Sequence, residues 1–136
     1  MIIKVVACIL HRRNKVLISS RPPQKELAGF YEFPGGKVKE NEFFLSALKR
    51  ELFEELLIKI DLNNVIFLKN YFIKRNDKKI LINFFICDKR LGRIKPMENQ
   101  CFKWTMIKRL CNENMLSSNR KIIEYLNLNF SFPSRR

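Results

Sequence analysis

Several residue types and patterns are scarce in this chain, and each scarcity excludes a class of protein. With only 4 Gly and 5 Pro among 136 residues, the chain is neither collagen-like nor low-complexity, and its 46% hydrophobic content is too high for a disordered protein. No apolar run approaches the ~18 residues that a membrane span needs, and the longest, residues 80–87, is interrupted by Asn83. The length therefore predicts one domain with its own hydrophobic core and no membrane partner.

Targeting signals and metal-binding cysteine motifs are scarce as well. The first ten residues carry no basic segment before their apolar stretch and no small-residue cleavage site, so they predict a first strand and a cytoplasmic location. His11 is the single histidine and no two cysteines form a C-x-x-C pair, which argues against a structural zinc site. We expect free thiols, mostly buried, at Cys8, Cys87, Cys101 and Cys111.

Acidic residues are outnumbered, with 13 Asp and Glu against 27 Lys and Arg and a formal net charge of +14. An excess of this size suggests a polyanionic partner such as a phosphorylated metabolite or a nucleic acid. Compositional drift is the alternative, because the basic residues are scattered and Lys, Ile, Asn and Phe, all with A/T-rich codons, are abundant. The acids are not scattered, since six of the 13 lie between residues 32 and 55.

Hydrophobic periodicity predicts strands interspersed with helices. Apolar, β-branched runs predict strands at residues 2–10, 15–20, 65–74, 79–88 and 101–107. Polar stretches predict hairpin connections at residues 11–14 and 75–78, and loops or turns at residues 21–31, 32–36 and 90–100. Helices are predicted at residues 41–57 and 119–128. This order predicts an α/β (α+β) fold, a mixed sheet sandwiched by helices, in residues 1–128, followed by a frayed basic tail in residues 129–136.

The helix at residues 41–57 carries an acidic stripe beside an apolar one. Leucines at three- and four-residue intervals form the apolar stripe: Leu45, Leu48, Leu52 and Leu56. Glu51, Glu54 and Glu55 fall within about 100° of arc next to it. Like charges at this spacing cost roughly 0.2–0.5 kcal/mol per pair. A hard divalent cation reverses that penalty, because Mg²⁺ and Mn²⁺ prefer carboxylate oxygens; a solvated acidic face is the alternative.

The spacing around this helix favours the metal site. Gly36, just upstream, permits close approach of the backbone to a cation. Five residues separate Gly36 from Glu42, and seven separate Glu42 from the sequence Arg50-Glu-Leu-Phe-Glu-Glu. This pattern resembles the Nudix box, G-x5-E-x7-R-E-U-x-E-E-x-G-U, in which U is a bulky aliphatic residue. Every charged position matches, and Leu52 and Ile58 occupy the aliphatic positions.

One position departs from the box, because Leu57 stands where the family has its last glycine. That glycine closes the helix, and a leucine in the left-handed conformation costs on the order of 1 kcal/mol. We expect the change to affect the loop that follows and not the carboxylates.

The resemblance covers nearly the whole chain and is closest to the MutT-type 8-oxo-dGTP diphosphatases, whose E-F-P-G-G-K segment matches Glu32 to Lys37. It implies a Nudix-type α/β/α sandwich with a mixed, curved sheet. It also implies a monomeric enzyme that uses Mg²⁺, or Mn²⁺ in its place. The implied reaction hydrolyses 8-oxo-dGTP to 8-oxo-dGMP and pyrophosphate, which keeps a mutagenic nucleotide out of DNA.

The resemblance further implies roles for individual residues. Metal ligands are implied at Gly36, Glu51, Glu54, Glu55 and Glu98, with Glu98 either completing the metal site or acting as a base. The residues implied to orient these ligands are Glu42 and Arg50. Substrate contacts are implied for Arg21, Glu32, Phe33, Lys37 and Asn119. In this scheme Phe33 stacks on the purine and Asn119 reads the oxidised base.

Alternatives remain for two residues and for the function as a whole. Phe33 can equally pack in the core, and Asn119 can be a helix N-cap, the more so because Arg120 and Lys121 follow it where the subgroup has Glu-Pro. A Nudix hydrolase can act on another noncanonical or pyrimidine nucleoside triphosphate, or on a pterin triphosphate. A basic nucleic-acid-binding module lacks the clustered basic face it would need, and an inactive Nudix scaffold would not retain every carboxylate. We therefore expect a small-molecule nucleotide substrate and no stable nucleic-acid partner.

Overall fold

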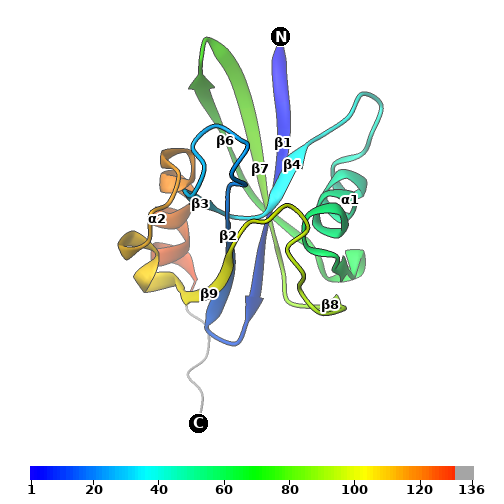
Figure 1. Ribbon diagram of the computed structural model, residues 1–136, viewed down its shortest axis with the longest axis vertical. Helices are drawn as coiled ribbons and strands as arrows, with labels where there is room; N and C mark the ends of the chain where they lie inside the picture. The colour runs from blue at the N-terminus through cyan, green and yellow to red at the C-terminus, as the bar shows by residue number, and fades with distance from the viewer. Residues whose placement is uncertain (131–136) are drawn as a thin grey trace.

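Figure 1 shows a twisted mixed sheet with one helix against each face, and residues 1–130 are the part of the chain that this computed structural model describes. The sheet consists of β1 (Ile2–Arg12), β2 (Lys15–Ser20), β3 (Tyr31–Glu32), β4 (Gly35–Lys37), β6 (Ile66–Arg75), β7 (Lys78–Cys87) and β9 (Phe102–Met106). The order across it is β3-β2-β1-β7-β6, while β4 pairs with β1 and β9 with β2. The β1–β7 pair is parallel and the other pairs are antiparallel, so the predicted mixed sheet is confirmed.

Two apolar cores lie on the two faces of the sheet, because successive residues of a strand point to opposite sides. In β1, Ile9 joins the core on the side of α2 (Arg120–Asn129), whereas Leu10 joins the core on the side of α1 (Phe44–Leu56). Helix α2 contributes Ile122, Ile123 and Leu126 to its core. This layering is the expected α/β/α sandwich.

Helix α1 follows the predicted pattern except at its start. It buries Leu48, Leu52 and Leu56 of the apolar stripe, whereas Leu45, in the first turn, is 36% exposed. The helix begins three residues later than predicted, since Asn41 has a φ of 62°, which is incompatible with a right-handed helix.

Leu57, which departs from the box, ends α1 in the conformation that the family's glycine favours. Leu57 adopts φ 58° and ψ 30°, the left-handed conformation, and its N–H donates to the carbonyl oxygen of Phe53 at 2.9 Å. The chain then enters β5 (Lys59–Ile60), which pairs with β8 (Arg90–Leu91). β8 lies in the segment that was predicted as a loop, residues 90–100. Strands of two residues are too short to show an alternating pattern, so the sequence did not predict this small sheet.

Residues 32–36 were expected to form a turn or loop, which holds only for Phe33 and Pro34, because Glu32 belongs to β3 and Gly35 and Gly36 belong to β4. Strand β3 pairs with β2, and β4 pairs with β1. Gly35 makes the second pairing possible, because a Cβ atom there would overlap the carbonyl oxygen of Val6. Phe33 is thus fixed between two segments that are both held by the sheet.

Strands β6 and β7 form the predicted hairpin with a tighter turn. The strands reach Arg75 and restart at Lys78, so the connection contains only Asn76 and Asp77, with φ values of 52° and 63°. Positive φ at both positions is typical of a two-residue hairpin turn, in which Asn and Asp are tolerated. Alternation along β6 places Ile73 and Arg75 on the same face of the sheet.

Other connections are short 3₁₀ helices: η1 (Leu62–Asn64), η2 (Ile107–Asn112) and η3 (Ser117–Asn119). Residue 129, predicted as the start of the tail, is the last residue of α2, and Phe130 packs against the core on that side. Residues 131–136 of the predicted tail lie outside the described residues. Within residues 1–130, no helix is long and apolar enough to cross a membrane.

The cysteines are free, but only half are buried. Cys8 and Cys87 lie on β1 and β7 and face the core on the α1 side. Cys101 and Cys111 are exposed, so the expectation of mostly buried thiols was wrong for these two. They lie just before β9 and within η2, where one side of the chain faces solvent.

Candidate active site

Helix α1 carries a linked group of charged side chains next to its buried leucines. Arg50 lies at the centre, and its Nη1 donates to Glu51 Oε1 at 2.8 Å and to Glu54 Oε1 at 3.1 Å. Its Nε and Nη2 donate to the Glu42 carboxylate at 2.8 and 2.9 Å, and Nη2 also donates to Lys37 O at 3.0 Å. The pairing with Arg50 lowers the pKa of Glu42 to about 2. Arg50 thus holds the carboxylates of the helix and of the preceding loop in fixed positions.

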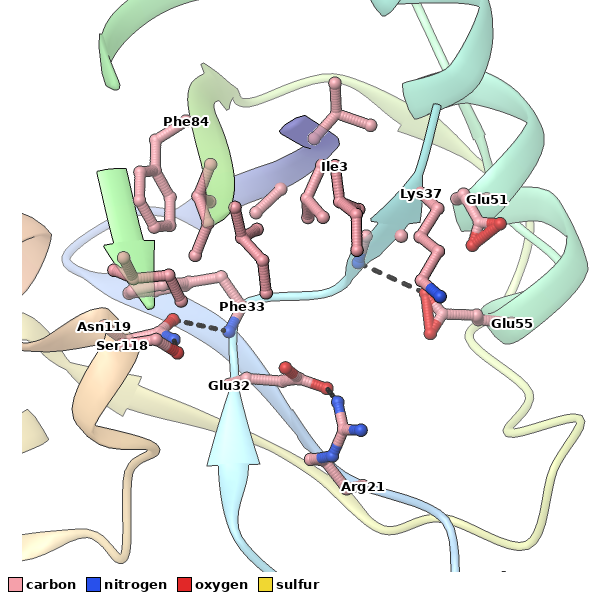
Figure 2. Close-up of a pocket in the computed structure, with 18 of the residues that line it drawn as sticks. Ile3, Arg21, Glu32, Phe33, Lys37, Glu51, Glu55, Phe84, Ser118 and Asn119 are labelled. Atoms are coloured by element: carbon pink, nitrogen blue, oxygen red, sulfur yellow. Dashed lines mark hydrogen bonds and ion pairs between the residues drawn. The ribbon is translucent and has the colours of Figure 1, made fainter. Parts of the chain in front are cut away.

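Glu55 is the carboxylate whose charge is least compensated. Its Oε1 accepts a hydrogen bond from Gly35 N at 3.2 Å (Figure 2). Burial raises the pKa of Glu55 well above its usual range, and the charges of Glu51, Glu32 and Glu98 raise it further. Burial also raises the pKa of Glu51, against the opposing effect of its ion pair. A cation placed here would stabilise the ionised forms of both side chains.

Three observations indicate that these residues suit a divalent metal ion. The side-chain donors are carboxylate oxygens, which Mg²⁺ and Mn²⁺ prefer. Glu98 Oε1 is buried and has no hydrogen-bond partner among the described residues, and its loop is tied to Glu55 O by the side chain of Gln100 at 3.1 Å. A Cβ atom on Gly36 would overlap the carboxylate of Glu51, so glycine is needed for this close approach.

The carboxylates are nevertheless not arranged as a closed metal cage. Within residues 1–130, no group of three or more His, Cys, Asp or Glu side chains is close enough to hold a metal ion. Arg50 bridges Glu51 and Glu54 instead. A metal ion bound by both glutamates must therefore displace these contacts of Arg50.

A cavity of about 450 Å³ lies beside the charged group. Apolar side chains of β1, β6 and β7 contribute to its walls: Ile3, Val5, Ile73, Ile80, Ile82 and Phe84. Figure 2 shows Glu51 and Glu55 on one side of this cavity, and Ser118 and Asn119 on the opposite side. Its volume is within the range of roughly 300–1,000 Å³ that small-molecule sites occupy.

The side of the cavity away from the glutamates is held by a buried amide. Asn119 is 4% exposed, and its Oδ1 accepts a hydrogen bond from Phe33 N at 3.3 Å while its Nδ2 donates to Ser118 Oγ at 3.2 Å. Its side chain makes no capping hydrogen bond to α2, so the alternative of a plain N-cap is wrong. Phe33 is 3% exposed and packs edge-on against Phe84, yet it also lines the cavity. Core packing and a place in the pocket are therefore compatible for Phe33.

Arg21 and Glu32 form an ion pair at the edge of the cavity. Arg21 Nη1 lies 3.4 Å from Glu32 Oε2, and Arg21 Nε donates to Glu26 O at 2.7 Å. Burial raises the pKa of Glu32, and the nearby Arg21 guanidinium partly opposes that shift. This pair offers a ligand one strong donor and one acceptor in a half-buried setting.

The cavity brings together most of the predicted site residues: Arg21, Glu32, Phe33, Gly36, Lys37, Glu51, Glu55 and Asn119. Four others lie outside the lining that the described residues form: Glu42, Arg50, Glu54 and Glu98. Ion pairs join Arg50 to Glu42, Glu51 and Glu54. The charge of Glu98 raises the pKa of Glu55.

Four polar lining residues were given no role from the sequence, namely Ser20, Lys25, Arg75 and Ser118. The alternation of β6 could have shown Arg75 on the same face as Ile73, had its register been known. Lys25 lies in the loop between β2 and β3, where no periodic signal exists. Ser118 precedes Asn119 in η3, and its sequence neighbours gave no sign of the cavity.

Comparison with known proteins agrees with this geometry. A NUDIX domain model matches residues 1–126, so the chain belongs to the Nudix family. Within the family, it is 38% identical over 122 residues to the 8-oxo-dGTP diphosphatase of Buchnera aphidicola subsp. Schizaphis graminum, which covers 90% of this chain and 91% of that protein.

Two further relatives are informative. A solved MutT structure, from Aliivibrio salmonicida or Vibrio cholerae, superposes with a TM-score of 0.81 at 26% identity, covering 96% of this chain and 100% of that one. The CTP pyrophosphohydrolase of Escherichia coli is 52% identical, but over only 54 residues, or 40% of each chain. The fold and the MutT-type resemblance are thus confirmed.

Proposed function

We propose that this protein is a divalent-metal-dependent diphosphatase that hydrolyses 8-oxo-dGTP to 8-oxo-dGMP and pyrophosphate. One observation supports this above the others: a single cavity joins the glutamates of α1 to the buried amide of Asn119. Such a cavity can bind the phosphates near the carboxylates and the base near the amide. The relative from Buchnera aphidicola, named 8-oxo-dGTP diphosphatase, supports the same substrate.

At the phosphate side, the proposal gives the carboxylates the task of holding metal. Glu51, Glu54 and Glu55 would bind Mg²⁺, or Mn²⁺ in its place, with the carbonyl oxygen of Gly36 and the side chain of Glu98 as further ligands. Bound metal would neutralise charge on the phosphate oxygens and favour attack by water on a phosphorus of the α–β anhydride. The P–O bond between these two phosphates would break, which releases the nucleoside monophosphate and pyrophosphate. To bind this ion, Glu51 and Glu54 must give up their contacts with Arg50. Arg50 can release them because its ion pair with Glu42 keeps its side chain anchored.

The remaining charged residues orient or bind. Glu42 and Arg50 would orient the ligands, as residues one step from a metal commonly do. Lys37 and Arg21 line the cavity and would bind phosphate oxygens. Glu98, next to Glu55, is the residue proposed to take a proton from water if it does not bind metal.

At the base side, selectivity would come from the amide of Asn119 beside the ring of Phe33. 8-Oxoguanine carries a hydrogen on N7 and an oxygen at C8, where guanine has an acceptor and a hydrogen. Asn119 presents one donor and one acceptor in a buried setting, and Phe33 adds an apolar surface. A site that pairs these atoms rejects the unoxidised base, because a wrong partner leaves buried polar groups unpaired.

The test is pyrophosphate release from 8-oxo-dGTP and dGTP at sub-saturating concentrations, with Mg²⁺ and again after chelation. The proposal predicts a large excess of kcat/KM for 8-oxo-dGTP and no turnover without the metal. Comparable activity on both nucleotides would contradict the proposed substrate while leaving the Nudix chemistry intact.

The second candidate is a pyrimidine nucleoside triphosphate, because the Escherichia coli relative is named CTP pyrophosphohydrolase. Adding CTP and dCTP to the same assay separates the two. A single cytoplasmic Nudix domain acting as a monomer on a free nucleotide completes the proposal, with sanitation of the nucleotide pool as its biological purpose.

A further inference from the structure

Two polar side chains at the base side of the cavity have no role in the proposal so far. Arg75 is the last residue of β6, and Ser118 lies in η3, 43 positions later in the chain. Both line the cavity beside Asn119. Arg75 is half-buried, and its aliphatic neighbour on the same strand face, Ile73, belongs to the cavity wall.

These side chains continue the hydrogen bonds of Asn119 into a relay of three steps. Phe33 N donates to Asn119 Oδ1 at 3.3 Å, and Asn119 Nδ2 donates to Ser118 Oγ at 3.2 Å. Arg75 Nη2 then donates to the same Ser118 Oγ at 3.3 Å. The relay therefore connects β6, η3 and the segment between β3 and β4.

The chemistry of the two ends determines which way the amide of Asn119 is turned. A backbone N–H and a guanidinium can only donate hydrogen bonds. The donor at Phe33 requires the amide oxygen on its side, which leaves the amide nitrogen facing Ser118. Ser118 Oγ accepts from both Arg75 Nη2 and Asn119 Nδ2, so both of its lone pairs are used. Arg75 thereby holds the serine oxygen in position opposite the amide nitrogen of Asn119.

A fixed amide has a consequence for base selection. An amide that rotates freely offers a donor or an acceptor at the same point, and so it accommodates either an N7 lone pair or an N7–H. An amide held in one orientation offers one pattern only and penalises the other base. The orientation is thus as important for discrimination as the presence of the side chain.

We propose that Arg75 is a positioning residue that acts through Ser118 to lock the amide of Asn119, and thereby sets the preference for the oxidised over the unoxidised purine. The inference rests on the proposed function, in which Asn119 reads the base. The lock lies across the cavity from Glu51 and Glu55 (Figure 2), so it should not alter the metal-dependent step.

The test compares Arg75→Met and Ser118→Ala with the wild-type protein, using kcat and KM for 8-oxo-dGTP and for dGTP. Each variant is expected to lower the ratio of the two kcat/KM values about tenfold, mainly through KM, with kcat for 8-oxo-dGTP within about twofold of wild type. Arg75→Lys, which keeps a charged donor, should recover part of the ratio. The double variant should be no worse than the single ones, because both remove the same relay.

Lys74→Met is the matched control, since Lys74 is the exposed neighbour on β6 and its loss removes the same charge. It should leave the ratio unchanged. A wild-type-like ratio in both Arg75→Met and Ser118→Ala overturns the inference, whereas the proposed function survives if the wild-type protein still prefers 8-oxo-dGTP. Absence of that preference in the wild-type protein contradicts both.

A second measurement tests the fixed orientation of the Asn119 amide in the absence of substrate. In NMR spectra, Arg75→Met should speed hydrogen exchange at the Phe33 amide and shift the side-chain amide signals of Asn119, while Lys74→Met should do neither. Unchanged Asn119 signals in Arg75→Met would overturn the lock directly.

Discussion

The two sides of the cavity are built on opposite principles. The side at α1 gathers carboxylates whose charges repel one another, and burial together with that repulsion raises the pKa of Glu55 well above its usual range. The side at Asn119 is built around a neutral amide whose hydrogen bonds to Phe33 N and Ser118 Oγ are made within the fold. Charge repulsion on the first side destabilises the folded protein until a cation binds. The second side is stable without a ligand and suited to discriminating bases by shape and polarity.

This contrast separates chemistry from selectivity. Arg50 restrains the carboxylates while allowing exchange of its contacts, because it is anchored to Glu42 and to the carbonyl oxygen of Lys37. Asn119 is held in a single orientation by Phe33 N, 86 positions away in the chain, and by the adjacent Ser118. Variants on the first side should therefore change rate or metal response, and those on the second should change substrate preference.

The largest effect is expected for Glu51→Gln, on the α1 side. Loss of one metal-binding carboxylate removes several kcal/mol of transition-state stabilisation, so kcat should fall by roughly 10²–10⁴-fold. Steady-state pyrophosphate release measures it, and circular dichroism verifies the fold. Glu40→Gln, at an exposed carboxylate in the preceding loop, is the control and should retain full activity. Undiminished turnover in Glu51→Gln would remove this residue from the proposed metal site.

Asn119→Ala should give the next largest effect, confined to preference. Removing the amide deletes the donor–acceptor pair and leaves Phe33 N unpaired, so the ratio of kcat/KM for 8-oxo-dGTP over dGTP should fall roughly 10–100-fold. Competition between the two nucleotides in one reaction measures this ratio directly. An unaltered ratio would mean that the amide only supports the fold.

Glu55→Gln should change stability in a direction that reveals the charge imbalance. Because burial raises the pKa of Glu55 in the folded state, ionising it costs stability: the wild-type protein loses stability as pH rises from the unfolded pKa through the folded pKa. At pH 7 without metal, the glutamine variant should therefore melt at least about 2 °C higher. The difference between the two melting curves should vanish at low pH, and Mg²⁺ should stabilise only the wild-type protein. A lower melting temperature for the variant would contradict the account of this side.

The smallest effect concerns the helix end behind the carboxylates. Leu57→Gly should stabilise the protein by about 0.5–1 kcal/mol in chemical denaturation, because glycine adopts the left-handed conformation without the strain of a Cβ atom. Leu57→Ala keeps that strain and loses the side chain, so it should not stabilise. Equal effects of the two substitutions would show that the backbone conformation is not what costs energy.

The two sides also differ in how visible they are in the sequence. Glu51, Glu54 and Glu55 share one helix, where a period of 3.6 residues relates spacing to direction, so their grouping could be predicted. The main helices could be predicted for the same reason, and most strands could be predicted from their apolar, β-branched runs. Phe33 and Asn119 lie 86 positions apart, and only the pairing of strands brings them together. Spacing alone could not choose between a helix cap and a pocket residue for Asn119.

Short-range geometry was the other limit. The strands at β3, β4, β5 and β8 have two or three residues each, and their pairing depends on close contacts such as that of Gly35 with β1. Arg75 belongs to a strand whose end depends on a two-residue turn, and the predicted turn of four residues placed it in a loop. Its position beside the cavity therefore emerged only from the fold.

The most direct test of the division between the two sides is one experiment on three proteins. It determines kcat/KM for 8-oxo-dGTP and dGTP with Mg²⁺ in the wild-type protein, Glu51→Gln and Asn119→Ala. The account predicts that Glu51→Gln lowers both values by a similar factor and leaves their ratio intact, while Asn119→Ala reduces the ratio and largely retains kcat. A changed ratio in Glu51→Gln, or an equal loss on both nucleotides in Asn119→Ala, would contradict it.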